Sequence, residues 1–199
     1  MTVKPSRDYA DVWYRRQAPA DLPAYPELQA AVEADVCVIG GGLAGLTAAY
    51  DLAKAGRRVV LVEARRVGWG ASGRNGGFVS PGYSLGFEAI AARVGQPAAK
   101  DLFRMSLEGV QIVAGHIRDL GISAANPRHG ILGAVRYDAG RGLADHRDWL
   151  AQEFNYDVTL LDRPALAQHV TSSSYHQALH DQNAFHFDPL GYCLGLARA

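Results

Sequence analysis

Three glycines and one glutamate stand at the spacing of a nucleotide-binding site. Gly40, Gly42 and Gly45 fit the pattern G-x-G-x-x-G, in which the first glycine permits a tight turn and the second lets the backbone approach a pyrophosphate. The third lets a helix pack closely on a strand. Glu63 follows 18 residues after Gly45, where a carboxylate can accept hydrogen bonds from adenosine ribose hydroxyls. These residues predict a dinucleotide site.

The segments around these residues predict a β-α-β unit. Residues 36–39 are a short β-branched apolar run, which predicts a strand buried on both faces, and residues 59–62 predict a second buried strand. Between them, apolar residues recur at intervals of three and four from Leu43 to Ala55, a helical pattern that ends before Gly56. The amino end of that helix would offer N–H groups to a phosphate. With 22 glycines in the chain the glycine pattern alone is weak, and the complete unit favours a nucleotide site over a glycine turn in another α/β fold.

A second glycine-rich stretch follows Glu63 and reads GWGASGRNGG over residues 68–77. Its glycines exclude a stable helix, since each destabilises one by roughly 1 kcal/mol. Backbone amides of such a stretch can line a long ligand, as a flavin dinucleotide requires along its diphosphate and ribityl chain. Trp69, Phe78 and Val79 add apolar bulk that argues against a flexible surface loop. The stretch therefore predicts a ligand-lining segment.

These features together resemble the FAD-dependent oxidoreductases of the D-amino-acid oxidase (DAO) superfamily, in its gamma-glutamylputrescine oxidase-like branch. The resemblance rests on an arm with Tyr9 and Trp13, the turn VCVIGGGLAGL, Glu63 and GWGASGRNGG, and runs essentially from end to end. It implies a non-covalent FAD, because Arg74 and Asn75 occupy the region where some relatives carry the histidine that attaches their flavin. The implied contacts are Gly40, Gly42, Leu43, Ala44 and Gly45 at the pyrophosphate, Glu63 at the ribose with Ala64 and Arg65 beyond it, and Gly70, Ala71, Ser72, Arg74, Asn75, Gly76 and Gly77 along the diphosphate, ribityl chain and flavin ring.

The β-α-β unit predicts an α/β fold class with a parallel sheet and helices, and the resemblance implies a Rossmann-like FAD-binding domain followed by the start of an α+β substrate domain. The expected parts are an arm at 1–34 with a helical turn within 26–32, the first part of the FAD-binding domain at 35–121, the start of the substrate domain at 122–187, and a helix returning to the FAD domain at 188–199. Periodicity also predicts helices over 96–120, 143–154 and 165–169, the last capped by Asp162, and strands over 130–135 and 158–161.

The final segment predicts a helix that is cut short. Asp188 and Pro189 have the types of a cap and a first turn, and the apolar stripe that follows is still running at Ala199 without a stop signal. By the resemblance, relatives continue for about as many residues again. We therefore expect a truncated chain, the amino-terminal half of such a protein, in which FAD retention and substrate binding depend on the missing half.

The resemblance implies oxidation of an amine or amino acid by hydride transfer to flavin N5, hydrolysis of the resulting imine, and reoxidation by oxygen. Two alternatives stay open. One is a non-catalytic remnant that binds a nucleotide without turnover, and the other is an NAD-dependent dehydrogenase, which would leave the second glycine stretch unexplained. The substrate, the catalytic residues, the electron acceptor and the oligomeric state cannot be assigned from the sequence.

Composition excludes several other classes. The chain has 20 basic and 20 acidic residues, so it shows no electrostatic footprint for nucleic acid. No stretch approaches the roughly 20 apolar residues of a membrane span. Charged residues such as Lys4 and Arg7 interrupt the amino terminus where a secretory signal would be apolar, which predicts a cytoplasmic protein. The expected partner is a small molecule, with neither nucleic acid nor membrane.

Neither the cysteines nor the histidines predict a metal site. Cys37 and Cys193 lack ligand spacing and are predicted to be reduced, buried thiols. His176 and His180 stand four residues apart, with His186 nearby, but their segment reads as loop and strand, so the spacing would not bring the rings onto one helical face. We expect no bound metal.

Overall fold

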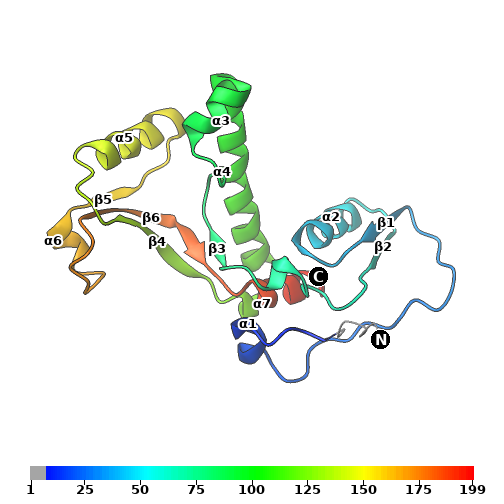
Figure 1. Cartoon of the computed structure of the whole chain (residues 1–199). Helices are drawn as coiled ribbons and strands as arrows, with labels where there is room; N and C mark the ends of the chain where they lie inside the picture. The colour runs from blue at the N-terminus through cyan, green and yellow to red at the C-terminus, as the bar shows by residue number, and fades with distance from the viewer. Residues whose placement is uncertain (1–7) are drawn as a thin grey trace, which may run out of the picture. The chain divides into compact units, whose positions relative to one another are not determined.

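The structure is a computed structural model that describes residues 8–199, and these divide into two compact units (Figure 1). Unit 1 contains the residues up to Gly77 together with 114–127 and 187–199, and unit 2 contains 78–113 and 128–186. Within the described residues, no helix has both the length and the apolar character needed to cross a lipid bilayer.

Unit 1 is built around a parallel β-α-β unit, as predicted. Strand β1 (Val36–Ile39) pairs in parallel with β2 (Val59–Val62), from Val36 opposite Val59 to Ile39 opposite Val62. Helix α2 (Leu43–Lys54) connects the two strands. It ends at Gly56, whose φ of +80° is the left-handed conformation that commonly follows a helix. The predicted α/β fold class is confirmed at this unit.

The prediction that β1 is buried on both faces is wrong, and β2, predicted to be buried, is half-buried along its length. In β1, Val36 and Val38 are half-buried, whereas Cys37 and Ile39 are exposed, Ile39 by 86%. Val38 faces α2, because a Cβ placed on Gly45 of that helix would lie 3.3 Å from Val38 Cγ1. Burial in β1 therefore alternates because α2 covers one face, and Cys37 on the other face is not the buried thiol that was predicted.

Helix α7 (Pro189–Leu196) forms much of the core of unit 1. It begins at the predicted cap, since Asp188 Oδ1 accepts a hydrogen bond of 2.9 Å from Gly191 N. It packs against the short helix η2 (Ser123–Ala125) so closely that a Cβ on Gly191 would lie 2.2 Å from the carbonyl oxygen of Ala124. The side chains of α7 that are fully buried include Leu190, Tyr192 and Cys193.

Among the described residues 8–34 of the amino-terminal arm there is one short helix, α1 (Trp13–Gln17), and the others are irregular. The helical turn predicted within residues 26–32 is absent, and that prediction is wrong. All seven of these residues are exposed. A short helix in water depends on an apolar face packed against a neighbour, and this segment has none.

Unit 2 contains an antiparallel sheet centred on the long strand β6 (Gln177–His186). Strands β3 (Phe78–Val79), β4 (Arg128–Val135) and β5 (Thr159–Leu161) all pair with β6, the sheet order being β3-β6-β4 with β5 also on β6. Its helices are α3 (Phe87–Val94), α5 (Gly142–Phe154) and α6 (Arg163–Leu166), while α4 (Gln96–Asp119) contributes residues to both units.

Two apolar clusters stabilise unit 2. Leu161, Leu166 and Ala178 are buried where α6 meets the sheet, and α6 is capped as predicted by Asp162, which accepts a 2.9 Å hydrogen bond from Ala165 N. A second cluster is aromatic: Phe87, Phe103, Trp149 and Phe154 lie with ring centroids 4.5–5.8 Å apart. These contacts join α3, α4 and α5.

Candidate functional site

The glycine turn between β1 and α2 has a geometry that only glycine allows at two positions. Gly40 has a φ of +106°, which L side chains rarely adopt. A Cβ on Gly45 would lie 2.0 Å from the carbonyl oxygen of Gly40, a distance that no side chain tolerates. The turn and the helix are therefore in the close contact that the third glycine of the pattern permits.

Glu63 lies beside this turn, immediately after β2. Its Oε2 accepts a hydrogen bond of 2.7 Å from Gly41 N, and its Oε1 accepts one of 2.9 Å from Arg65 N. Both carboxylate oxygens are thus oriented by the backbone. Because each carboxylate oxygen can accept more than one hydrogen bond, Glu63 retains capacity to accept bonds from ribose hydroxyls.

The second glycine stretch lies directly against the first. Gly68 N donates a 2.8 Å hydrogen bond to the carbonyl oxygen of Gly41, and Leu43 N donates a 2.9 Å bond to Ser72 Oγ. Leu43 is the first residue of α2, so its N–H has no partner within the helix. Ser72 also lies so near Gly42 that a Cβ there would be 2.8 Å from Ser72 Oγ. The two stretches form one continuous backbone-lined surface.

Side chains of the second stretch hold its own backbone in shape. The amide nitrogen of Asn75 donates to the carbonyl oxygens of Ala71 and Ser72 at 3.2 and 3.0 Å, and its Oδ1 accepts from Gly77 N at 2.8 Å. Arg74 Nε donates to the carbonyl oxygen of Gly70 at 3.2 Å. Asn75 therefore closes the loop around the short helix η1 (Ala71–Gly73).

Trp69 is a residue of this site that the sequence pattern did not assign to it. The Arg65 guanidinium carbon lies 3.6 Å from the Trp69 ring centroid, and that of Arg74 lies 4.7 Å away. Cations attract the face of an aromatic ring in this range, most strongly for tryptophan. Trp69 therefore holds two of the predicted cofactor-binding side chains. Trp69 stands four residues after Arg65 and five residues before Arg74. This position between two arginines is the sequence feature that could have indicated its role.

Every predicted cofactor-binding residue belongs to unit 1. The structure brings the turn, Glu63 and the second stretch into contact through the hydrogen bonds described above. Ala64, Ala71 and Gly76 are exposed along the same segment, whereas Gly77 is buried and its carbonyl oxygen accepts from Phe187 N at 2.9 Å. The predicted residues that follow Glu63 thus line one side of the glycine turn.

The geometry fits a dinucleotide. The amino end of the 12-residue helix α2 adjoins a carboxylate at the end of β2, and the space where a Cβ on Gly40 or Gly70 would stand is open within 4 Å. A hollow of about 1580 Å³ in unit 1 also reaches Glu63, Ala64 and Arg65, although most of it follows β2, α2 and the arm rather than the glycine turn. Within residues 8–199 no trio of His, Cys, Asp or Glu side chains is arranged to hold a metal ion.

Comparison with known proteins identifies a family for most of this chain. The family model described as DAO, FAD dependent oxidoreductase, matches residues 35–199. A probable oxidoreductase OrdL from Haemophilus influenzae is 38% identical over 176 residues, which are 88% of this chain and 41% of that protein. The gamma-glutamylputrescine oxidoreductase of Escherichia coli is 33% identical over 192 residues, which are 96% of this chain and 45% of that protein. The chain thus spans less than half the length of these relatives.

Solved structures give the same fold. An L-amino acid deaminase from Proteus vulgaris superposes with a TM-score of 0.70 at 18% sequence identity, over 89% of this chain and 40% of that one. At this identity the likeness concerns the fold alone.

Proposed function

Because the chain belongs to the DAO family of FAD-dependent oxidoreductases, we propose that unit 1 binds FAD without a covalent link and serves the oxidation of an amine or amino acid. FAD is the cofactor of the family, and this favours the flavin over the nicotinamide alternative. The relative named for gamma-glutamylputrescine supports a nitrogen-bearing substrate.

The observation that carries this proposal is the junction of the two glycine stretches. The hydrogen bonds from Gly68 N to the Gly41 carbonyl and from Leu43 N to Ser72 Oγ place the proposed pyrophosphate residues beside the proposed diphosphate and ribityl residues. A single extended ligand can then contact both stretches. A shorter nucleotide would need only one of them.

Each group of residues has a proposed role. The turn from Gly40 to Gly45 would receive the pyrophosphate at the amino end of α2, where N–H groups and the helix dipole favour an anion. Glu63 would accept hydrogen bonds from the adenosine ribose, and the segment from Gly70 to Gly77 would approach the ribityl chain and the flavin ring. When bound, FAD supplies the two-electron acceptor for a carbon–hydrogen bond next to the substrate nitrogen. The protein's task is to hold that carbon about 3–3.5 Å from the acceptor atom.

The test is the visible absorption spectrum of the 199-residue chain after incubation with FAD and gel filtration. We expect flavin bands to co-elute with the protein. Gly45→Ala should abolish retention or weaken it at least tenfold, because its Cβ would lie 2.0 Å from the Gly40 carbonyl oxygen. Gly109→Ala is the matched control, since it also changes a helical glycine but has nothing within 4 Å of the added Cβ. Equal retention by both variants would contradict the proposed site.

Substrate oxidation is tested next by adding amines and amino acids to flavin-loaded protein without oxygen and following the loss of the flavin bands. Bleaching by one of these classes supports the proposed reaction. Retained flavin that no such compound bleaches would instead support the alternative of a chain that binds the nucleotide without turnover.

A further inference from the structure

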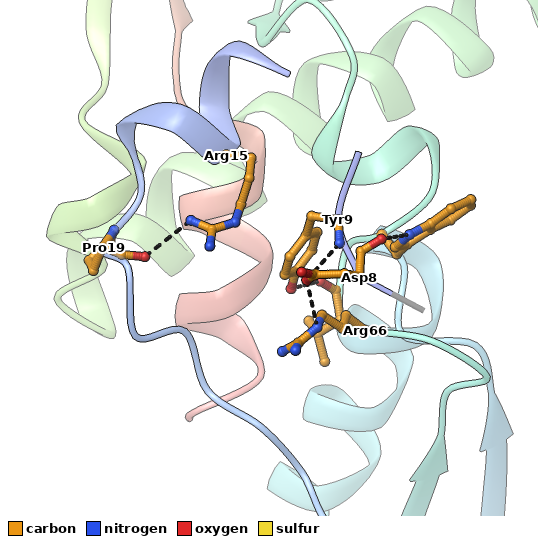
Figure 2. A network of polar contacts seen from close by, with 7 residues as sticks. Asp8, Tyr9, Arg15, Pro19 and Arg66 are labelled. Atoms are coloured by element: carbon orange, nitrogen blue, oxygen red, sulfur yellow. Dashed lines mark hydrogen bonds and ion pairs between the residues drawn. The ribbon is translucent and has the colours of Figure 1, made fainter. Parts of the chain in front are cut away.

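The amino-terminal arm contacts the segment that connects Glu63 to the second glycine stretch (Figure 2). Tyr9 donates its hydroxyl hydrogen to the carbonyl oxygen of Val67 at 2.7 Å. Asp8 forms an ion pair of 3.1 Å with Arg66 through its carboxylate, and its carbonyl oxygen accepts a 2.7 Å hydrogen bond from Trp69 Nε1. Asp8 and Tyr9, which we call the latch, thus bind three of four consecutive residues.

The bond from Tyr9 reaches the glycine turn through one peptide group. The Val67 carbonyl and the Gly68 N–H belong to the same planar peptide, so fixing one end orients the other. Gly68 N donates to the carbonyl oxygen of Gly41, and Gly41 N donates to Glu63. A series of hydrogen bonds therefore runs from Tyr9 through this peptide and Gly41 to the carboxylate proposed to bind the ribose.

The surroundings of the latch contacts also indicate that losing them would disturb the local structure. Val67 is buried, with 6% of its surface exposed, so its carbonyl oxygen has little access to water as a replacement donor for Tyr9. Burial raises the pKa of Tyr9 to about 12, so the hydroxyl keeps the hydrogen it donates at any pH used for assay. The latch contact from the Asp8 carbonyl oxygen holds Trp69, on whose ring Arg65 and Arg74 stack.

We propose that Tyr9, assisted by Asp8, is a positioning residue of the FAD site: its hydroxyl fixes the Val67–Gly68 peptide and thereby the geometry of Gly41 and Glu63 before the cofactor binds. This rests on the proposed function for the identity of the ligand. The latch contacts themselves are independent of it.

The test compares Tyr9→Phe with the unchanged 199-residue chain by amide hydrogen exchange without FAD and by FAD titration. Removing the hydroxyl should accelerate exchange in residues 66–74 about three- to tenfold and raise the FAD dissociation constant by a similar factor. Tyr25→Phe is the matched control, because Tyr25 lies in the same arm and donates its hydroxyl to the Ala197 carbonyl oxygen at 3.3 Å, away from the glycine stretches. Tyr25→Phe should change neither the exchange rate nor the FAD dissociation constant.

If flavin bleaching by a substrate is observed, saturating FAD should restore the rate of bleaching in Tyr9→Phe. This is expected of a residue that positions the site and takes no part in the reaction.

The outcomes separate the two proposals. Unchanged exchange in residues 66–74 of Tyr9→Phe overturns the latch, whether or not FAD binds. Faster exchange with an unchanged FAD dissociation constant also overturns it as a positioning device. If the unchanged chain binds no FAD, the proposed function fails in this chain, and exchange alone then decides whether Tyr9 fixes the segment.

Discussion

At the scale of single residues, the cysteines occupy opposite environments. Cys37 is exposed on the uncovered face of β1, whereas Cys193 in α7 is fully buried, and burial, reinforced by the negative charge of Asp188, raises the pKa of its thiol to about 12. Because the thiolate is the reactive form, burial protects Cys193 both sterically and by keeping it protonated.

We therefore expect one of the two thiols to react rapidly with a disulfide reagent such as DTNB at pH 8, and the second only after unfolding. The measurement is the absorbance of the released thiolate with time. Cys37→Ser should remove the rapid phase, and Cys193→Ser should leave it intact. Two rapid equivalents in the unchanged chain would contradict the burial of Cys193.

At the scale of elements, α7 depends on close packing against η2 and the residue before it. A Cβ on Gly195 would lie 2.2 Å from Ile122 Cγ2, and Ile122 is itself buried. The helix and its neighbour can approach this far only because the side chain is missing.

Gly195→Ala should therefore lower the free energy of unfolding by about 1–3 kcal/mol, the usual range for overpacking a filled core. Denaturant titration measures the change. Gly115→Ala is a suitable control in α4, since its added Cβ would meet nothing closer than 3.9 Å, and replacing a helical glycine there should stabilise by up to about 1 kcal/mol. A Gly195→Ala chain as stable as the control would show that α7 can shift away from Ile122.

The elements that the sequence predicted well are those determined by local rules. The strands, the helix and the turn of the β-α-β unit follow from periodicity and glycine spacing, and the caps Asp162 and Asp188 follow from residue type before a proline or apolar run. Burial was predicted poorly, because it depends on which distant segment covers a face. Cys37 and Ile39 are apolar residues in a strand, yet α2 covers only the other face of β1.

The candidate site likewise has a part that the sequence predicted and a part that it did not. Its proposed cofactor-binding residues are close together in sequence and could be identified by pattern. The latch contacts join residues 58 and 61 positions apart, and no spacing rule relates Tyr9 to Val67 or Asp8 to Trp69. In the arm itself, Trp13 is 67% exposed, whereas Tyr9 is half-buried and donates its hydroxyl hydrogen to the Val67 carbonyl oxygen.

At the scale of the whole molecule, buried or half-buried acidic groups that are neutral at physiological pH occur in both units. Burial raises the pKa of Cys193 from an ordinary value of 9.0 to about 12, and raises that of Tyr192 to about 12. In unit 2, burial and hydrogen bonds to Asp181 raise the pKa of Tyr156 above its ordinary value. Each of these groups keeps its proton in the folded chain at a pH where the unfolded chain has lost it.

The sign of the resulting pH dependence follows directly. Below about pH 9 both states hold these protons and the stabilisation is fully present. From pH 9 toward pH 12 the unfolded chain binds fewer protons than the folded chain, so the free energy of unfolding must fall, by at most about 1.4 kcal/mol per pH unit for Cys193. Denaturant titrations at pH 8, about pH 10 and about pH 11 would measure this slope.

The variant Cys193→Ala should start from a lower free energy of unfolding, but that free energy should decline less steeply with pH. The titrating thiol is gone in this variant, while Tyr156 and Tyr192 remain. Parallel declines in the two chains would mean that Cys193 ionises as readily in the folded chain as in the unfolded one, which its complete burial in α7 argues against.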